Sequence, residues 1–141
     1  MRFRGAEAME VCSLYADCYQ ELAVFKWIES QKAGFDIGQE YAIHRWVRDH
    51  WSGYLRSKLL EHLLGYKYWS ELDKGDFGIL QHRFQDQCML LDRIIDRLKA
   101  NQENLDILLW AQDWNIDTED VISILVALDI NSRRISPRFD F

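Results

Sequence analysis

The chain has 141 residues and a hydrophobic content of 48%, so it is long enough to bury a core without disulfides or a structural metal. That hydrophobic content also excludes a chain that is disordered throughout. The net charge of −6 is local: residues 105–130 hold six of the 23 acidic residues and no lysine or arginine, and the other 17 acidic residues equal the 17 basic ones. A negative surface there would repel nucleic-acid phosphates and attract a basic partner, although we prefer the simpler interpretation that these acids cap and solubilise two short helices.

Three features of the sequence bear on the cell compartment. There are three cysteines and no C-x-x-C pair, which is typical of a reducing cytosol where thiols pack as small core residues. The first residues lack the apolar stretch of a secretory signal peptide. No apolar run approaches the roughly 20 residues that span a bilayer. We therefore expect a cytoplasmic protein that does not cross a membrane.

A first long helix is predicted over residues 5–32, ending near Gly34. A central helix is predicted over residues 37–64, where apolar residues recur at helical spacing. Asp36 and Gln39 resemble a capping box at its start, and Gly65 follows its last apolar residue. Because the connection between the two helices is short, we expect them to pack antiparallel as a hairpin.

After the central helix, residues 65–78 are predicted to be irregular, with Tyr66, Tyr68 and Trp69 folding back over the end of the bundle. Asp76 is expected to cap a third helix that ends near Asn101. Its apolar stripe includes Cys88, and a candidate break lies near Asp86 or Gln87.

Two short helices are predicted next. The first ends near Asp113 and the second begins at Asp117. We expect their buried positions to be Leu105, Leu108 and Leu109 in the first, and Val121, Ile122, Leu125 and Leu128 in the second. Residues 131–141 have no period and are expected to be loosely held or to depend on a partner. The fold class is therefore all-α, with one helical domain over residues 1–130 and a tail over residues 131–141.

One candidate for chemistry is a metal or cofactor site on the central helix. Glu40 and His44 are one turn apart and are expected to point toward the core, as are Trp51, Lys58 and His62. Ferritin-like metal bundles instead use a duplicated Glu-x-x-His with two further glutamates, and this chain has no second pair. The simpler interpretation of Glu40 and His44 is a structural pair, so we assign no cofactor.

A second candidate is a helix-turn-helix in residues 107–128. Ala111, Ile116, Val121 and Ile124 have the spacing that this motif requires, and Asn115 occupies its usual glycine position. The would-be recognition helix begins Asp117, Thr118, Glu119, Asp120, without a lysine or arginine for phosphate. The spacing predicts a helical corner, whereas the charge argues against a DNA-binding function.

The third candidate is a protein-binding surface. Several large apolar residues lie off the predicted core stripes: Phe25, Ile28, Trp46, Leu60, Leu64 and Trp110. Surplus apolar surface of this kind is typical of an interface. The sequence holds no P-loop, G-x-S-x-G or H-E-x-x-H motif, so we assign no catalytic residue. The leading hypothesis is a small interaction module that self-associates or belongs to a larger assembly, with a metal-binding bundle and a transcriptional regulator as alternatives.

Overall fold

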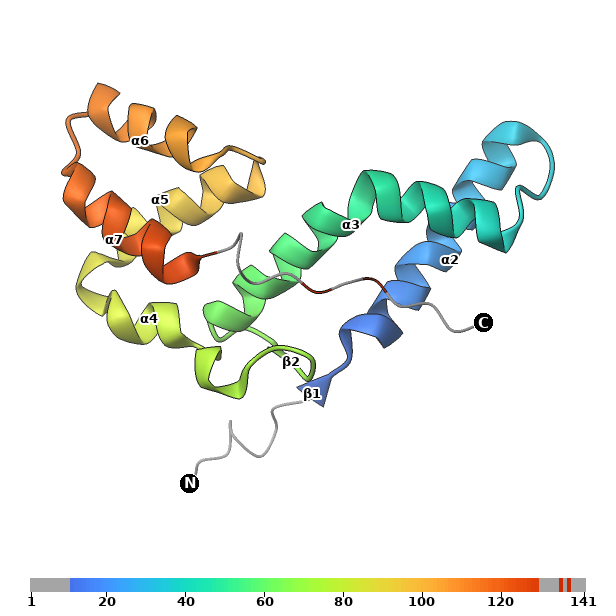
Figure 1. Ribbon diagram of the computed structural model, residues 1–141, viewed down its shortest axis with the longest axis horizontal. Coiled ribbons are helices and arrows are strands. Elements are labelled where there is room, and N and C mark those ends of the chain that lie inside the picture. The colour runs from blue at the N-terminus through green and yellow to red at the C-terminus, as the bar shows by residue number, and fades with distance from the viewer. Residues whose placement is uncertain (1–10, 130–134, 136, 138–141) are drawn as a thin grey trace.

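A computed structural model describes residues 11–129, 135 and 137 and confirms the all-α class (Figure 1). Residues 5–10 of the predicted first helix and most of the predicted tail lie outside the described residues. The described elements are β1 (Val11–Cys12), α2 (Leu14–Ala33), α3 (Gln39–Leu63), β2 (Tyr68–Trp69), α4 (Ile79–Arg83), α5 (Cys88–Lys99), α6 (Asn104–Asp113) and α7 (Thr118–Leu128), with 3-10 turns at Lys74–Asp76 and Gln85–Gln87.

Helix α2 begins at Leu14, and residues 11–13 of the predicted first helix are not helical, because two polar side chains fix the start of α2 there. The Ser13 hydroxyl accepts from the Ala16 N–H at 3.3 Å as an N-cap. That hydroxyl also donates to one Glu71 oxygen, and the Leu14 N–H donates to the other, both at 2.7 Å. At the other end Gly34 adopts φ 79°, which is the left-handed end that the sequence predicts.

Helix α3 runs from Gln39 to Leu63, close to its predicted bounds. The predicted capping box is wrong in detail: Gly38 is the N-cap, and the Asp36 carboxylate accepts from the Gly38 N–H at 2.9 Å before the helix starts. Gly65 has φ 80°, as expected for the residue that ends the helix. A Cβ on Gly65 would lie 3.2 Å from Gly78 Cα, so the chain passes closely over itself here.

The segment after α3 is held by the buried imidazole of His62. The Trp69 N–H donates to Nδ1 at 3.2 Å, which leaves the proton on Nε2 to donate to the Asp73 carbonyl at 2.8 Å. Trp69 is fully buried and Tyr68 packs edge-on against the His62 ring, whereas Tyr66 remains exposed. Two of the three aromatic residues therefore fold back as predicted, and β2 pairs in parallel with β1, which the sequence does not predict.

The predicted third helix is broken into α4 and α5, at the place where the sequence indicates a break. Phe84 leaves helical geometry, with φ −120° and ψ 31°, and its buried ring packs in the core. The chain turns there, so Cys88 starts α5 on the exposed side. The prediction of a buried Cys88 is therefore wrong, as is the prediction that Asp76 caps a helix, because Gly78 occupies that position.

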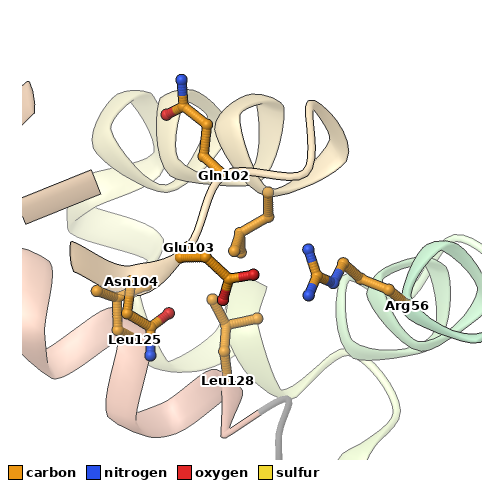
Figure 2. A pocket seen from close by; sticks show the side chains of 7 residues that line it. Arg56, Gln102, Glu103, Asn104, Leu125 and Leu128 are labelled. Atoms are coloured by element: carbon orange, nitrogen blue, oxygen red, sulfur yellow. The ribbon is translucent and has the colours of Figure 1, made fainter. Parts of the chain in front are cut away.

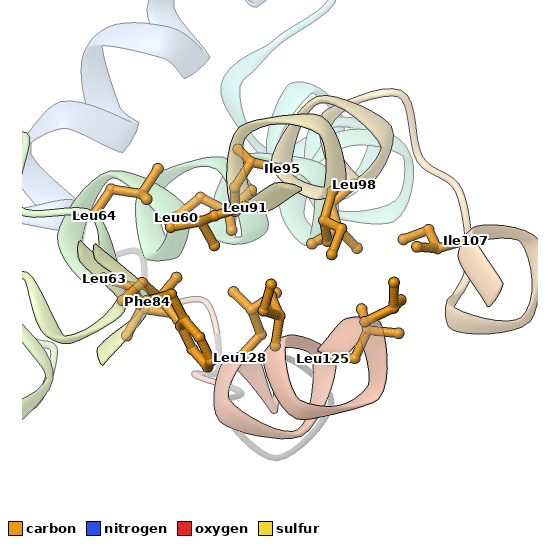
Figure 3. Close-up of a cluster of buried hydrophobic side chains, with 14 of the residues drawn as sticks. Leu60, Leu63, Leu64, Phe84, Leu91, Ile95, Leu98, Ile107, Leu125 and Leu128 are labelled. Carbon is orange, nitrogen blue, oxygen red and sulfur yellow. The ribbon is translucent and has the colours of Figure 1, made fainter. Parts of the chain in front are cut away.

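Two hydrophobic clusters share α3. The first joins α2 to the N-terminal half of α3, with Leu14, Cys18, Leu22, Trp46 and Trp51 among its buried members. The second joins the C-terminal end of α3 to α4, α5, α6 and α7 (Figure 3). The α2–α3 hairpin therefore extends away from the group formed by the other helices (Figure 1).

Helices α6 and α7 have the predicted bounds but partly different buried faces. In α6, Ile107 and Ala111 are buried, whereas Leu105 and Leu109 are exposed. In α7, Val121, Leu125 and Leu128 are buried as predicted, Ile124 joins them, and Ile122 is exposed. The faces that pack are those turned toward α3, α5 and each other (Figure 3).

Within the predicted tail, Ile135 is held against the hairpin. The Trp51 indole N–H donates to the Ile135 carbonyl at 3.0 Å, and Ile135 packs on the first cluster. This one residue is thus more tightly held than the sequence predicts. Among the described helices, none has the length and apolar character required to cross a bilayer.

Candidate functional site

A groove runs along one side of the hairpin between α2 and α3. It has a volume of about 550 Å³. Twelve residues line it: Glu21, Val24, Phe25 and Ile28 from α2, Trp46, Asp49, His50, Gly53, Tyr54, Ser57 and Lys58 from α3, and Asn101 from the turn after α5. Grooves of this kind between two helices can receive an amphipathic helix of a partner.

The floor of the groove is built from aromatic rings. Trp46 is buried and packs edge-on against Tyr54, with ring centroids 5.3 Å apart. His50 is exposed and packs edge-on against Phe25, at 5.4 Å between ring centroids. These contacts give the groove a rigid apolar base with an imidazole at its edge.

A polar network ties the two sides of the groove together. The Tyr54 hydroxyl lies 2.7 Å from the Asp17 carboxylate and 2.9 Å from the Leu14 carbonyl. Burial, followed by the hydrogen bond to Asp17, raises the pKa of the Tyr54 phenol, so the phenol stays protonated and donates. The Lys58 ammonium lies 3.7 Å from Asp17 and 3.6 Å from Glu61, and it lies over the ring of Trp69. Both signs of charge are therefore present along this groove.

Beyond the floor, α2 carries apolar side chains that no helix covers in the part of the chain that the structure describes. Val24, Trp27 and Ile28 are 57%, 65% and 40% exposed. Their spacing of i, i+3 and i+4 places them together on one face of the helix, and Val24 and Ile28 also line the groove. We call these three residues the α2 strip.

The residues named from the sequence for partner binding have different environments. Trp46, Leu60 and Leu64 are buried inside the clusters, so the expectation that they lie on the surface is wrong. All three residues belong to α3 or its C-cap, and α3 packs against other helices on more than one side. Positions outside its predicted apolar stripe are therefore also part of the core. Phe25 is half-buried in the groove, and Trp110 is half-buried with the Arg97 guanidinium 4.1 Å from its ring centroid. Ile28 is exposed and lies on the groove.

Glu40 and His44 are both exposed on the first turns of α3. The prediction that they point toward the core is wrong, whereas His62 is buried as predicted. Among the described residues, no three histidine, cysteine, aspartate or glutamate side chains gather closely enough to hold a metal ion.

The predicted helical corner is present between α6 and α7. Asn115 adopts φ 57°, and Ala111, Val121 and Ile124 are fully buried at the corner, with Ile116 packed beside them. The Asp117 carboxylate caps α7 by accepting from the Glu119 N–H at 2.9 Å. The first turn of α7 is therefore acidic, as the sequence shows.

A much smaller cavity, of about 20 Å³, lies between α3 and the loop that follows α5 (Figure 2). Arg56 of α3 points toward the carboxylate of Glu103 across it, and Leu125 and Leu128 of α7 line its apolar side. This volume suits a single water molecule rather than a ligand.

Sequence reasoning named Phe25, Ile28 and Trp46 but missed Val24 and Trp27 as groove or strip residues. The available signal was the periodicity of the first helix, which carries apolar residues on two sides. Only one of these sides can pack on α3 in a two-helix hairpin. Comparison with known proteins gives no match to a family model, to a curated protein or to a solved structure.

Proposed function

We propose that this protein is a non-catalytic interaction module that associates with itself through the groove between α2 and α3. The observation that supports this proposal is the α2 strip of three large apolar side chains, two of which, Val24 and Ile28, line a groove of about 550 Å³. Exposed apolar surface next to a concave surface is typical of protein interfaces, and a tryptophan is a frequent anchor.

The charges of the groove favour an identical partner over a strongly charged one. Glu21 and Asp49 contribute negative charge and Lys58 contributes positive charge, while the α2 strip is uncharged. In a symmetric dimer the same surface meets itself, so a surface that is apolar and carries both signs is self-compatible. The acidic α6–α7 corner lacks this balance, because two copies of it would repel.

Two glutamate substitutions on neighbouring positions of α2 test the proposal. Val24→Glu places a charge in the groove, whereas Ala23→Glu places one on an exposed α2 position that does not line it. We expect light scattering to give a mass above 16.8 kDa for the wild-type chain and for Ala23→Glu, and the monomer mass for Val24→Glu. A wild-type chain that is monomeric at every concentration contradicts the proposal.

The alternatives of a metal-binding bundle and a transcriptional regulator gain no supporting observation from the described residues. Glu40 and His44 have no third ligand near them among these residues, and the corner helix offers acidic groups where DNA requires basic ones.

A further inference from the structure

Gly53 stands near the middle of α3, at a position where nothing in the described part of the chain requires a glycine. A Cβ built on Gly53 meets no heavy atom within 4 Å, and Gly53 is not among the glycines with positive φ. Glycine in a helix interior is about 1 kcal/mol less favourable than alanine. A helix that packs closely on α3 at this position would give the missing side chain a physical reason.

The contacts between α2 and α3 show which residues of α2 lie opposite Gly53 along the axis of the hairpin. Phe25 meets His50, and Asp17 meets Lys58 further along the same antiparallel pair. Interpolating between these two pairs puts Gly53 level with the stretch of α2 between Glu21 and Val24. Gly53 thus interrupts the α3 wall of the groove beside the start of the α2 strip.

We infer, on the basis of the proposed function, that the occupant of the groove is the hairpin of a second copy, stacked groove face to groove face about a two-fold axis parallel to the helices. A rotation about this axis leaves the position of each residue along the helix axis unchanged. It also exchanges the two sides of the hairpin, so each α2 lies on α3 of the partner subunit. Val24 of one copy then packs on Gly53 of the other. All neighbouring helices run antiparallel, as in an up-down four-helix bundle.

Charge and shape both fit this occupant. Glu21 of one copy lies level with Tyr54 in the other, about one helical turn from Lys58, so groups of opposite charge lie near each other. The missing side chain at Gly53 lets the partner's α2 approach closely at the point where Val24 projects. Hairpin-on-hairpin stacking also covers Ile28 on both copies.

The first test compares arginine at two adjacent positions of α3. Gly53→Arg fills the groove, whereas Ser52→Arg places the same side chain on an exposed position that does not line it. Arginine is a good helix former, so both variants should retain the helical circular dichroism of the wild type. We expect the dimer dissociation constant to rise about tenfold or more for Gly53→Arg and to change less than about threefold for Ser52→Arg.

The second test measures which helices meet across the interface. Cys12→Ser and Cys88→Ser remove the more accessible thiols, since Cys18 is buried. Chains that carry Glu21→Cys are then mixed with chains that carry Gly53→Cys and oxidised. We expect a disulfide between positions 21 and 53 of different copies. Oxidation of Gly53→Cys chains alone should give none, because the two α3 helices lie on a diagonal of the bundle, beyond the Cα separation that a disulfide bridges.

The outcomes separate this inference from the proposed function. A wild-type chain that stays monomeric removes both. A wild-type dimer whose dissociation constant is unchanged by Gly53→Arg, or which forms a 53–53 disulfide, removes the stacking described here and leaves self-association in place.

Discussion

The Tyr54 hydroxyl of α3 lies 2.7 Å from the Asp17 carboxylate of α2, at the level where the two helices of the hairpin enter the rest of the molecule. The same hydroxyl reaches the carbonyl of Leu14, the first residue of α2. One phenol thus fixes both the start of α2 and its register against α3. The groove depends on this register, because its two walls come from these helices.

Removing this hydroxyl should weaken the hairpin. Tyr54→Phe keeps the ring against Trp46 but leaves Asp17 and the Leu14 carbonyl without the phenol. We expect the free energy of unfolding to fall by about 1–2 kcal/mol, measured by urea denaturation. Tyr41→Phe, on an exposed position of the same helix, should change it by less than about 0.5 kcal/mol. Equal effects of the two variants would show that the Asp17 contact contributes nothing.

Glu71 should make stability depend on pH. Burial works against its charged form, but the hydrogen bonds from the Ser13 hydroxyl and the Leu14 N–H outweigh it and lower the pKa of Glu71 in the folded state. A lowered folded pKa stabilises the protein above the unfolded pKa of about 4.3, and this contribution is lost as pH falls through the folded pKa.

Glu71→Gln removes that dependence. We expect the variant to be about 1 kcal/mol less stable than wild type at pH 7, a figure that allows for solvent screening of a partly exposed group, with the difference shrinking toward pH 3. Denaturant titrations of both proteins at several pH values provide the measurement. A stability difference that stays constant over this range would mean that the charge of Glu71 does not stabilise the start of α2.

His62 should be among the most sensitive positions of α3. Its side chain is fully buried, and both ring nitrogens are hydrogen-bonded, to Trp69 and Asp73. His62→Leu removes the acceptor of the Trp69 N–H and one of the donors to the Asp73 carbonyl, which still accepts from the Asp76 N–H, so we expect a loss of about 2–4 kcal/mol in thermal or urea unfolding. His44→Leu, on an exposed turn of the same helix, serves as the control and should lose less than about 1 kcal/mol. A loss at position 62 no larger than at position 44 contradicts the described geometry.

The cysteines should react in a fixed order. Cys88 is exposed and Cys12 is half-buried, whereas burial and then the nearby Asp17 and Glu21 carboxylates raise the pKa of the Cys18 thiol to about 12. With a thiol-reactive dye at pH 8, we expect Cys88 to be labelled first and Cys18 only after denaturation. Labelling of Cys18 in the folded protein at the rate of Cys88 would contradict the burial of α2 against α3.

The sequence predicts the fold best at helix ends, where the conformational preference of a single residue determines where the helix starts or stops. Gly34 and Gly65 end their helices with positive φ, and Asp117 caps α7, because these conformations strongly favour those residue types. The start of α2 was not predictable in the same way, since Glu71 reaches Ser13 from 58 residues away. A contact between such distant positions leaves no mark on local periodicity.

The buried faces were predictable only where a helix has a single apolar side. Helix α6 carries Leu105 and Leu109 on one side and Ile107 and Ala111 on the other, and only packing against α7 and its neighbours selects the second pair. The same ambiguity affects α2, where the sequence identified Ile28 but not Val24 or Trp27. Leu60 and Leu64 were assigned to the surface because the sequence does not show that α3 joins two clusters.

Sedimentation equilibrium of the wild-type chain over a dilution series tests self-association most directly. Self-association through the groove predicts a mass that tends to twice 16.8 kDa at high concentration and falls toward 16.8 kDa on dilution. A mass of 16.8 kDa at every concentration, from a chain whose circular dichroism shows it to be folded, would contradict the account.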